Sequence, residues 1–161
     1  MKNIILKVFM LAVISLAINL AFTSGVYSQE AQYKKAIDFT LEAISGEEII
    51  LSDLLKERKA VLVFWATWCP HCRKEMPHVE AFYKENKDKI AVVGVNSGES
   101  KVKVSKFIQE AGISYPIGLD LDTGVARSYG VRGIPTIIAI NKDWQIIYFG
   151  HSIEEAADKI K

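Results

Sequence analysis

The two cysteines of the chain, Cys69 and Cys72, stand three residues apart in the segment Trp68-Cys69-Pro70-His71-Cys72. An apolar run typical of a buried strand, residues 60–66, leads directly into this segment, and a helical pattern follows it. Cys69 is therefore predicted at a helix start, where free amides and the helix dipole favour thiolate and lower the thiol pKa below about 8.5. Thiolate is the attacking species in disulfide exchange, and Cys72, one turn further on, can attack a mixed disulfide on Cys69.

Two other roles for the cysteines, a zinc site and a purely structural disulfide, fit the sequence less well than exchange chemistry. A zinc site needs about four ligands, and only His71 and His78 could join the two thiolates, in a strained arrangement. A purely structural disulfide would close a very short loop, which constrains the unfolded chain little. We therefore predict a redox-active dithiol, no metal and no cofactor, because the dithiol itself carries two electrons.

Apolar runs and turn signals predict the elements that position this dithiol. Strands and helices alternate, and the last two strands form a hairpin, so the expected fold is α/β with a mixed central sheet flanked by helices. Ser52 is the predicted N-cap of the first short helix. The expected strands are 60–66, 90–95, 115–119, 136–140, 144–149 and two within 38–51, and the expected helices are 53–56, 69–86, 100–110, 123–129 and 153–160.

The first 28 residues have the composition of a secretory signal. Lys2 and Lys7 flank the start of an apolar run, residues 4–22, and no acidic residue appears before Glu30. We predict that residues 1–28 are a signal peptide or, alternatively, an N-terminal membrane anchor, since the run approaches the about 20 residues that span a bilayer. In both cases the remaining chain lies in the periplasm or at the extracytoplasmic face of the membrane.

Residues 29–161 are predicted to form one domain, which is long enough to bury its own core. The whole chain carries 20 basic and 19 acidic residues. Residues 1–28 contain two of the basic residues, Lys2 and Lys7, and no acidic one, so 18 basic and 19 acidic residues remain in 29–161. This balance gives no electrostatic reason to expect nucleic acid as a partner.

Three segments resemble the TlpA/ResA-like thioredoxin family of exported thiol–disulfide oxidoreductases, which is related to the redoxin and AhpC/TSA proteins. They are the active-site segment Phe64–Pro77, the stretch Val95–Lys101 and the loop Tyr129–Thr136. The resemblance extends from about Ile37 to the C-terminus. It implies a thioredoxin-like fold with an N-terminal β-hairpin and a central βα insertion.

The resemblance also implies roles for individual residues. Cys69 is the expected nucleophile and Cys72 the resolving thiol. Pro135 is expected to be cis and to face the cysteines, so that the backbone of Ile134 pairs with an extended substrate strand. The expected substrate-binding residues are Trp68, Pro70, His71, Ile134 and Pro135.

Glu75 matches an acidic position of the family one turn beyond Cys72. A partly buried carboxyl group there would have a raised pKa and could carry the proton that Cys72 loses. The residue that corresponds to the buried aspartate of cytoplasmic thioredoxins is Val63, so that route for the proton is closed. His78 and His151 are interpreted as surface or packing residues.

The dipeptide Pro70-His71 resembles that of strongly oxidising periplasmic thiol oxidases of the DsbA type. An imidazole beside the thiolate would favour the reduced form and make the disulfide a better oxidant. The long helical insertion of those oxidases is absent from this sequence. The direction of the reaction therefore stays open between a disulfide reductase and a disulfide donor.

The leading prediction is a thiol–disulfide oxidoreductase that reduces protein disulfides, including those of haem-attachment sites during cytochrome c maturation, with electrons from a membrane thiol transporter. One alternative is a thiol peroxidase of the peroxiredoxin type, although the Pro-x-x-x-Thr-x-x-Cys pattern before Cys69 is missing. Another alternative is a non-enzymatic module that holds extended peptides in the groove near Pro135.

Overall fold

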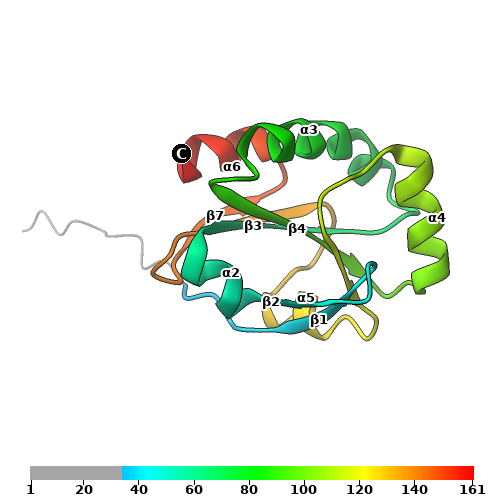
Figure 1. The fold of residues 1–161 in the computed structure, drawn as a ribbon, viewed down its shortest axis with the longest axis horizontal. Helices are drawn as coiled ribbons and strands as arrows, with labels where there is room; N and C mark the ends of the chain where they lie inside the picture. Colours follow the sequence, from blue (N-terminus) through cyan, green and yellow to red (C-terminus); the bar gives the residue numbers. More distant parts are fainter. Residues whose placement is uncertain (1–33) are drawn as a thin grey trace, which may run out of the picture. The chain divides into compact units, whose positions relative to one another are not determined.

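Strand β3, Lys59–Trp65, lies in the interior of a seven-stranded sheet within residues 34–161, the part of the chain that this computed structural model describes (Figure 1). The strand order is β2-β1-β5-β4-β3-β6-β7. β3, β4 and β5 run parallel and all other neighbours are antiparallel, so the sheet is mixed, as predicted. The remaining strands are β1 Thr40–Ala43, β2 Glu48–Ile50, β4 Ile90–Ser97, β5 Ile117–Asp120, β6 Thr136–Ile140 and β7 Ile146–Gly150.

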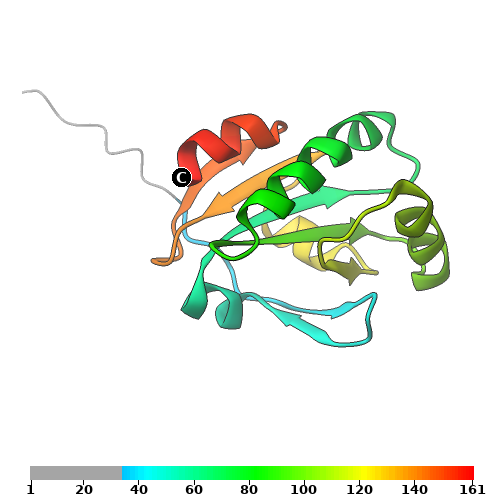
Figure 2. The same cartoon turned by 45° about the horizontal axis from the view of Figure 1, so that its top comes forward.

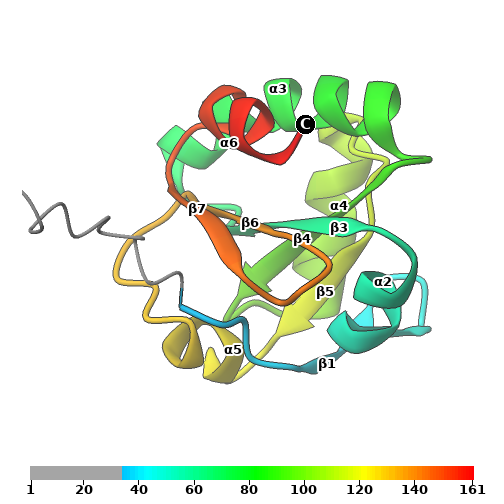
Figure 3. The same ribbon diagram turned by 90° about the vertical axis from the view of Figure 1, so that its left-hand side faces the viewer.

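Both faces of β3 are buried because successive side chains of a strand point to opposite sides. Val61, Val63 and Trp65 pack in the core formed with α3, α4 and α6. Ala60, Leu62 and Phe64 point to the other face and pack in the core formed with α2 and α5. Figure 2 and Figure 3 show the helices on the two sides of the sheet. The helices are α2 Leu51–Glu57, α3 Pro70–Asn86, α4 Lys101–Ala111, α5 Gly124–Ser128 and α6 Ile153–Ile160.

The two additions that the family resemblance implied are both present. β1 and β2 form the N-terminal hairpin, with Leu41 opposite Ile49. β5 and α5 lie between α4 and β6 in the chain and make up the central βα insertion. β5 pairs with β4 on one side and with β1 on the other, so the insertion links the hairpin to the rest of the sheet.

Three loops meet at one edge of the sheet, which is the edge that carries the cysteines. The parallel strands β3 and β4 end there at Trp65 and Ser97, and the antiparallel strand β6 starts there at Thr136. Phe64 is opposite Thr136, and Trp65 is opposite Asn96. The cysteine segment, the loop after β4 and the Ile134-Pro135 loop are therefore neighbours in space.

The start of α2 differs from the sequence prediction. Ser52 is the second residue of this helix, not its N-cap, and the capping position is held by Ile50 without a side-chain bond. The carboxylate of Asp38 accepts the Ser52 amide at 2.9 Å and the Phe39 amide at 3.0 Å. A residue 14 positions earlier thus satisfies a free amide of the first turn, which a local pattern cannot reveal.

The last hairpin also differs, because its turn is longer than predicted. Trp144 has a positive φ of 67° and belongs to the turn, so β7 begins only at Ile146. The side chain of Asn141 accepts the amides of Asp143 at 3.0 Å and Gln145 at 2.9 Å, which stabilises the wider turn.

The predictions for residues 1–28 and for the start of the domain at residue 29 lie outside the described residues. Within 34–161, no helix is both long and apolar enough to cross a membrane.

Candidate active site

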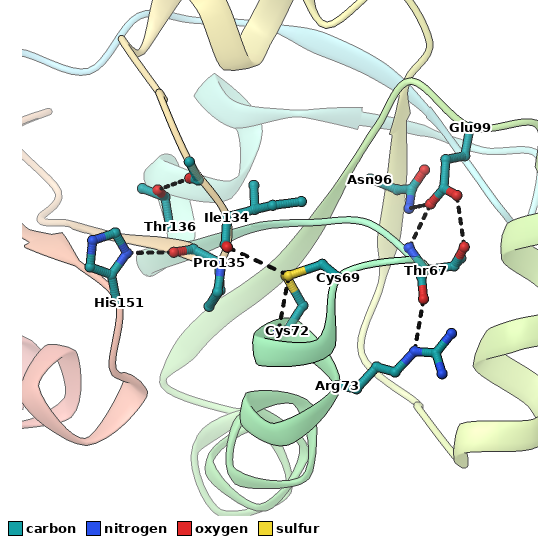
Figure 4. Close-up of a disulfide and its surroundings, with 11 residues drawn as sticks. Thr67, Cys69, Cys72, Arg73, Asn96, Glu99, Ile134, Pro135, Thr136 and His151 are labelled. Atoms are coloured by element: carbon teal, nitrogen blue, oxygen red, sulfur yellow. Dashed lines mark hydrogen bonds between the residues drawn. A yellow bond between two sulfur atoms is a disulfide. The ribbon is translucent and has the colours of Figure 1, made fainter.

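Cys69 is the N-cap of α3, and Pro70 is the first residue of the helix, as the sequence predicted. The Sγ atom of Cys69 accepts the backbone amide of Cys72 at 3.1 Å and is joined to Cys72 in a disulfide (Figure 4). The amide therefore already points at the sulfur on which a thiolate would form. Together with the helix dipole, this contact favours the anionic form of Cys69 after reduction.

The loop before β6 lies against this sulfur. The Ile134–Pro135 bond is cis, which confirms the prediction, and the carbonyl oxygen of Ile134 lies 3.5 Å from Cys69 Sγ. Two further contacts hold the loop: the Thr136 hydroxyl donates to the Gly133 carbonyl at 2.6 Å, and His151 Nδ1 lies 2.5 Å from the Pro135 carbonyl oxygen. The family resemblance predicted Ile134 and Pro135 beside the cysteines. The sequence did not predict that His151 contacts this loop.

The exposed part of the site is formed by the residues around the disulfide. Cys69 is 3% and Cys72 1% exposed. The two residues are about equally buried, so their exposure does not distinguish the nucleophile from the resolving thiol. Trp68 is 64% exposed and is the most exposed aromatic residue among the large apolar side chains of residues 34–161. His71 is exposed on the first turn of α3. Trp68 and His71 are thus accessible beside the disulfide, and their substrate-binding role stays a prediction.

Glu75 is half-buried one turn beyond Cys72, where the sequence placed it. Its carboxylate accepts the amide of Ile153, the first residue of α6, at 2.6 Å. Glu75 therefore also caps a helix that lies 78 positions further along the chain. Val63 is buried in the core beneath α3, which leaves no acidic group at that position. The proton-carrying role of Glu75 stays a prediction.

A buried carboxylate next to the cysteine segment was missed by the sequence analysis. Glu99 follows β4, its side chain is only 5% exposed, and it accepts the amide and the hydroxyl of Thr67, each at 2.7 Å. Asn96 Nδ2 donates to it at 3.0 Å and Lys103 Nζ at 2.6 Å. Burial would raise the pKa of Glu99, but the bonds from Lys103, Thr67 and Asn96 outweigh it and lower the pKa to about 2.

Arg73 completes the anchorage of the same segment. Its Nε donates to the Thr67 carbonyl at 2.8 Å, and its guanidinium lies 5.3 Å from the ring centre of Phe107 in α4. Thr67 is thus held on its amide, hydroxyl and carbonyl groups. Figure 4 shows this group on one side of the disulfide and the Pro135 loop on the other. The only sequence signal for the group was the family-like stretch that contains Glu99.

The described residues hold no group of three or more His, Cys, Asp or Glu side chains that could bind a metal ion. His78, the second histidine weighed for a zinc site, pairs instead with Glu154 of α6 at 3.1 Å.

Comparison with known proteins places this site in a family. The AhpC/TSA family model matches residues 33–149. The thiol-disulfide oxidoreductase ResA of Halalkalibacterium halodurans is 36% identical over 151 residues, which cover 91% of this chain and 85% of that protein. The chain belongs to the AhpC/TSA family as a ResA-like thiol–disulfide oxidoreductase.

Solved structures agree with this assignment. StoA of Bacillus subtilis superimposes with a TM-score of 0.66 at 27% identity, over 78% of this chain and 97% of that one. The thioredoxin domain of a thiol-disulfide oxidoreductase from Bacteroides vulgatus gives a TM-score of 0.71 at 24% identity, over 80% and 96% of the two chains, and supports the fold alone. The predicted thioredoxin-like fold and the enzyme class, a thiol–disulfide oxidoreductase of ResA type, are confirmed.

The low pKa of Glu99 predicts a pH-dependent contribution to stability. Because its folded-state pKa is about 2 and its ordinary value 4.5, the contribution is complete above about pH 4.5 and is lost as the pH falls towards 2. Glu99→Gln should lower the free energy of unfolding by about 1–3 kcal/mol at pH 6 and by much less at pH 3. Urea unfolding at both pH values measures this difference.

The matched control is Glu110→Gln, on the same helix as Lys103 but 65% exposed and 4.0 Å from its Lys106 partner. This change should cost under about 0.5 kcal/mol at either pH. An effect of Glu99→Gln that is equal at pH 6 and pH 3 would contradict the assignment.

Glu75→Gln separates the two roles of Glu75. The amide oxygen of glutamine still accepts the Ile153 amide, so the free energy of unfolding should stay within about 0.5 kcal/mol of the wild type. If Glu75 carries the proton of Cys72, closure of the Cys69–Cys72 disulfide should slow by about tenfold or more at neutral pH. Rapid mixing of the reduced protein with a small disulfide measures that rate, and a wild-type rate would leave Glu75 with the capping role only.

Proposed function

We propose that this ResA-like enzyme reduces disulfides of proteins outside the cytoplasm. The observation that carries the proposal is the position of Cys69 Sγ, which lies between the Cys72 amide at the start of α3 and the Ile134 carbonyl beside cis Pro135. The helix start favours a thiolate, and the backbone of Ile134 offers an extended partner to a substrate strand. The exposed Trp68 and His71 supply the rest of the contact surface.

The reaction balances with the dithiol as the only electron source. The Cys69 thiolate attacks one sulfur of the substrate disulfide, the substrate S–S bond breaks, and the leaving thiolate takes up a proton. Cys72 then loses its proton and attacks Cys69 Sγ, which releases the second substrate thiolate and forms the Cys69–Cys72 disulfide. Two electrons pass from enzyme to substrate, and an external dithiol must restore the reduced enzyme.

The place of action and the partners belong to the same proposal. The basic start and apolar run within residues 1–28 support export by a signal peptide or retention by an anchor. We propose a membrane thiol-electron transporter as the donor, because an exported dithiol has no access to cytoplasmic reductants. The resemblance to TlpA/ResA-like proteins supports the Cys-x-x-Cys-His disulfide of apocytochrome c as one substrate.

The dipeptide Pro70-His71 supports the opposite direction, donation of disulfides. His71 lies on the exposed first turn of α3, close in sequence to Cys69, and an imidazole there would stabilise the thiolate. Against this, the segment between β4 and β6 holds only α4, β5 and α5 as regular elements, without the helical insertion of DsbA-type oxidases. We therefore favour reduction.

Cysteine variants test the function and its location together. Cys72→Ala should accumulate mixed disulfides through Cys69, because the resolving thiol is gone, whereas Cys69→Ala should form none and lose reductase activity. Expressed with residues 1–28, the trapped complexes should occur in the extracytoplasmic fraction. Non-reducing gels of fractionated cells, with an insulin-reduction assay in vitro, give the readout. Reductase activity that survives Cys69→Ala would exclude the mechanism.

The reduction potential of the Cys69/Cys72 couple decides the direction. We expect a value at or below about −250 mV, near that of thioredoxin, which requires a dedicated electron supply. Equilibration of the purified protein in thiol buffers, followed by tryptophan fluorescence, measures it. A value near about −120 mV would instead identify a disulfide donor.

A further inference from the structure

We propose that His151 is a positioning residue that holds the Ile134-Pro135 loop in the conformation that accepts a substrate strand. The proposal rests on the proposed function, because it concerns how a polypeptide is bound beside Cys69. His151 belongs to the segment between β7 and α6, far from the cysteines in sequence, and its Nδ1 lies 2.5 Å from the Pro135 carbonyl oxygen (Figure 4).

The contact defines which ring nitrogen carries a proton. A carbonyl oxygen can only accept, so Nδ1 of His151 must be the donor. The Thr136 hydroxyl donates to the Gly133 carbonyl at 2.6 Å within the same loop. The peptide groups before and after the Ile134–Pro135 bond are therefore each tied by one side chain, and the Ile134 carbonyl between them stays 3.5 Å from Cys69 Sγ.

The segment that carries His151 is anchored without the imidazole. Ser152 donates its amide to the Tyr148 hydroxyl at 3.2 Å, and its own hydroxyl accepts the Glu155 amide at 3.4 Å. The Ile153 amide donates to Glu75 of α3 at 2.6 Å. This segment is thus a fixed support, tied to the helix that carries the cysteines, from which His151 reaches the loop opposite them.

The imidazole of His151 acts by orienting the loop backbone and not by filling space in the core. His151 is exposed, so its removal leaves no cavity in the core. The bond from Nδ1 instead restricts the backbone on which a substrate strand would pair. Loss of the bond should weaken binding of a polypeptide disulfide and leave the chemistry of Cys69 itself unchanged.

The test compares His151→Ala and His151→Asn with the wild type. The side-chain amide of asparagine can place an N–H donor close to the position of Nδ1, whereas alanine cannot. His78→Ala is the matched control, since His78 is also exposed but pairs with Glu154 of α6 and not with the Pro135 carbonyl. Each reduced protein is assayed with a peptide closed by a single disulfide and with a small aromatic disulfide that needs no strand pairing.

We expect His151→Ala to raise KM for the peptide about threefold to tenfold at nearly constant kcat, the range for one lost neutral hydrogen bond. The rate with the small disulfide should stay at the wild-type value, and His151→Asn should recover most of the peptide KM. His78→Ala should match the wild type in both assays.

Three results would overturn the inference: an unchanged peptide KM in His151→Ala, an equal loss with the small disulfide, or no recovery in His151→Asn while its melting temperature is that of the wild type. A wild-type protein that does not reduce the peptide at all would instead refute the proposed function.

Discussion

The active site depends on one constraint: the sulfur of Cys69 must be stabilised as an anion and still be open to attack another sulfur. The start of α3 meets the first need, because the Cys72 amide points at Cys69 Sγ from 3.1 Å. The loop opposite lies against the same sulfur, with the Ile134 carbonyl 3.5 Å from it.

The sheet brings the two elements together through strand direction. β3 delivers the cysteines at its carboxyl end, and β6, which is antiparallel to it, begins beside that end with the residue after Pro135. Side chains from outside the motif then hold the arrangement. Glu99 binds Thr67 on one side of the disulfide, and His151 binds Pro135 on the other.

Glu99 also shows how a buried charge can be kept in such a site. Its carboxylate is surrounded by donors from Thr67, Asn96 and Lys103, so the cost of burial is more than offset and the pKa falls to about 2. A satisfied carboxylate of this kind gives the loop before Cys69 a single geometry. Glu75 acts in a similar way between α3 and α6 through the Ile153 amide.

Most elements could be predicted because their signals are local. The buried run before Trp68 and the helical pattern after Cys69 identified β3 and α3, and the Asn141 turn identified the last hairpin. The errors arose where a distant or unusual backbone contact decides the boundary. At the start of α2, the side chain of Asp38, and not that of Ser52, accepts a free backbone amide. Trp144 has a positive φ and belongs to the turn, so β7 begins later than predicted.

The sequence by itself determined the chemistry of this protein: two thiols spaced by one helical turn at the end of a buried strand. This is possible because helix starts, strand burial and cysteine spacing are properties of neighbouring residues. The proline loop that faces the two thiols was expected only from the family resemblance. Only the tertiary structure decided that Glu99 holds Thr67, that Glu75 caps α6 and that His151 holds the Pro135 carbonyl. These bonds join residues between 16 and 78 positions apart, and their distances depend on how strands and loops pack, which no local pattern encodes.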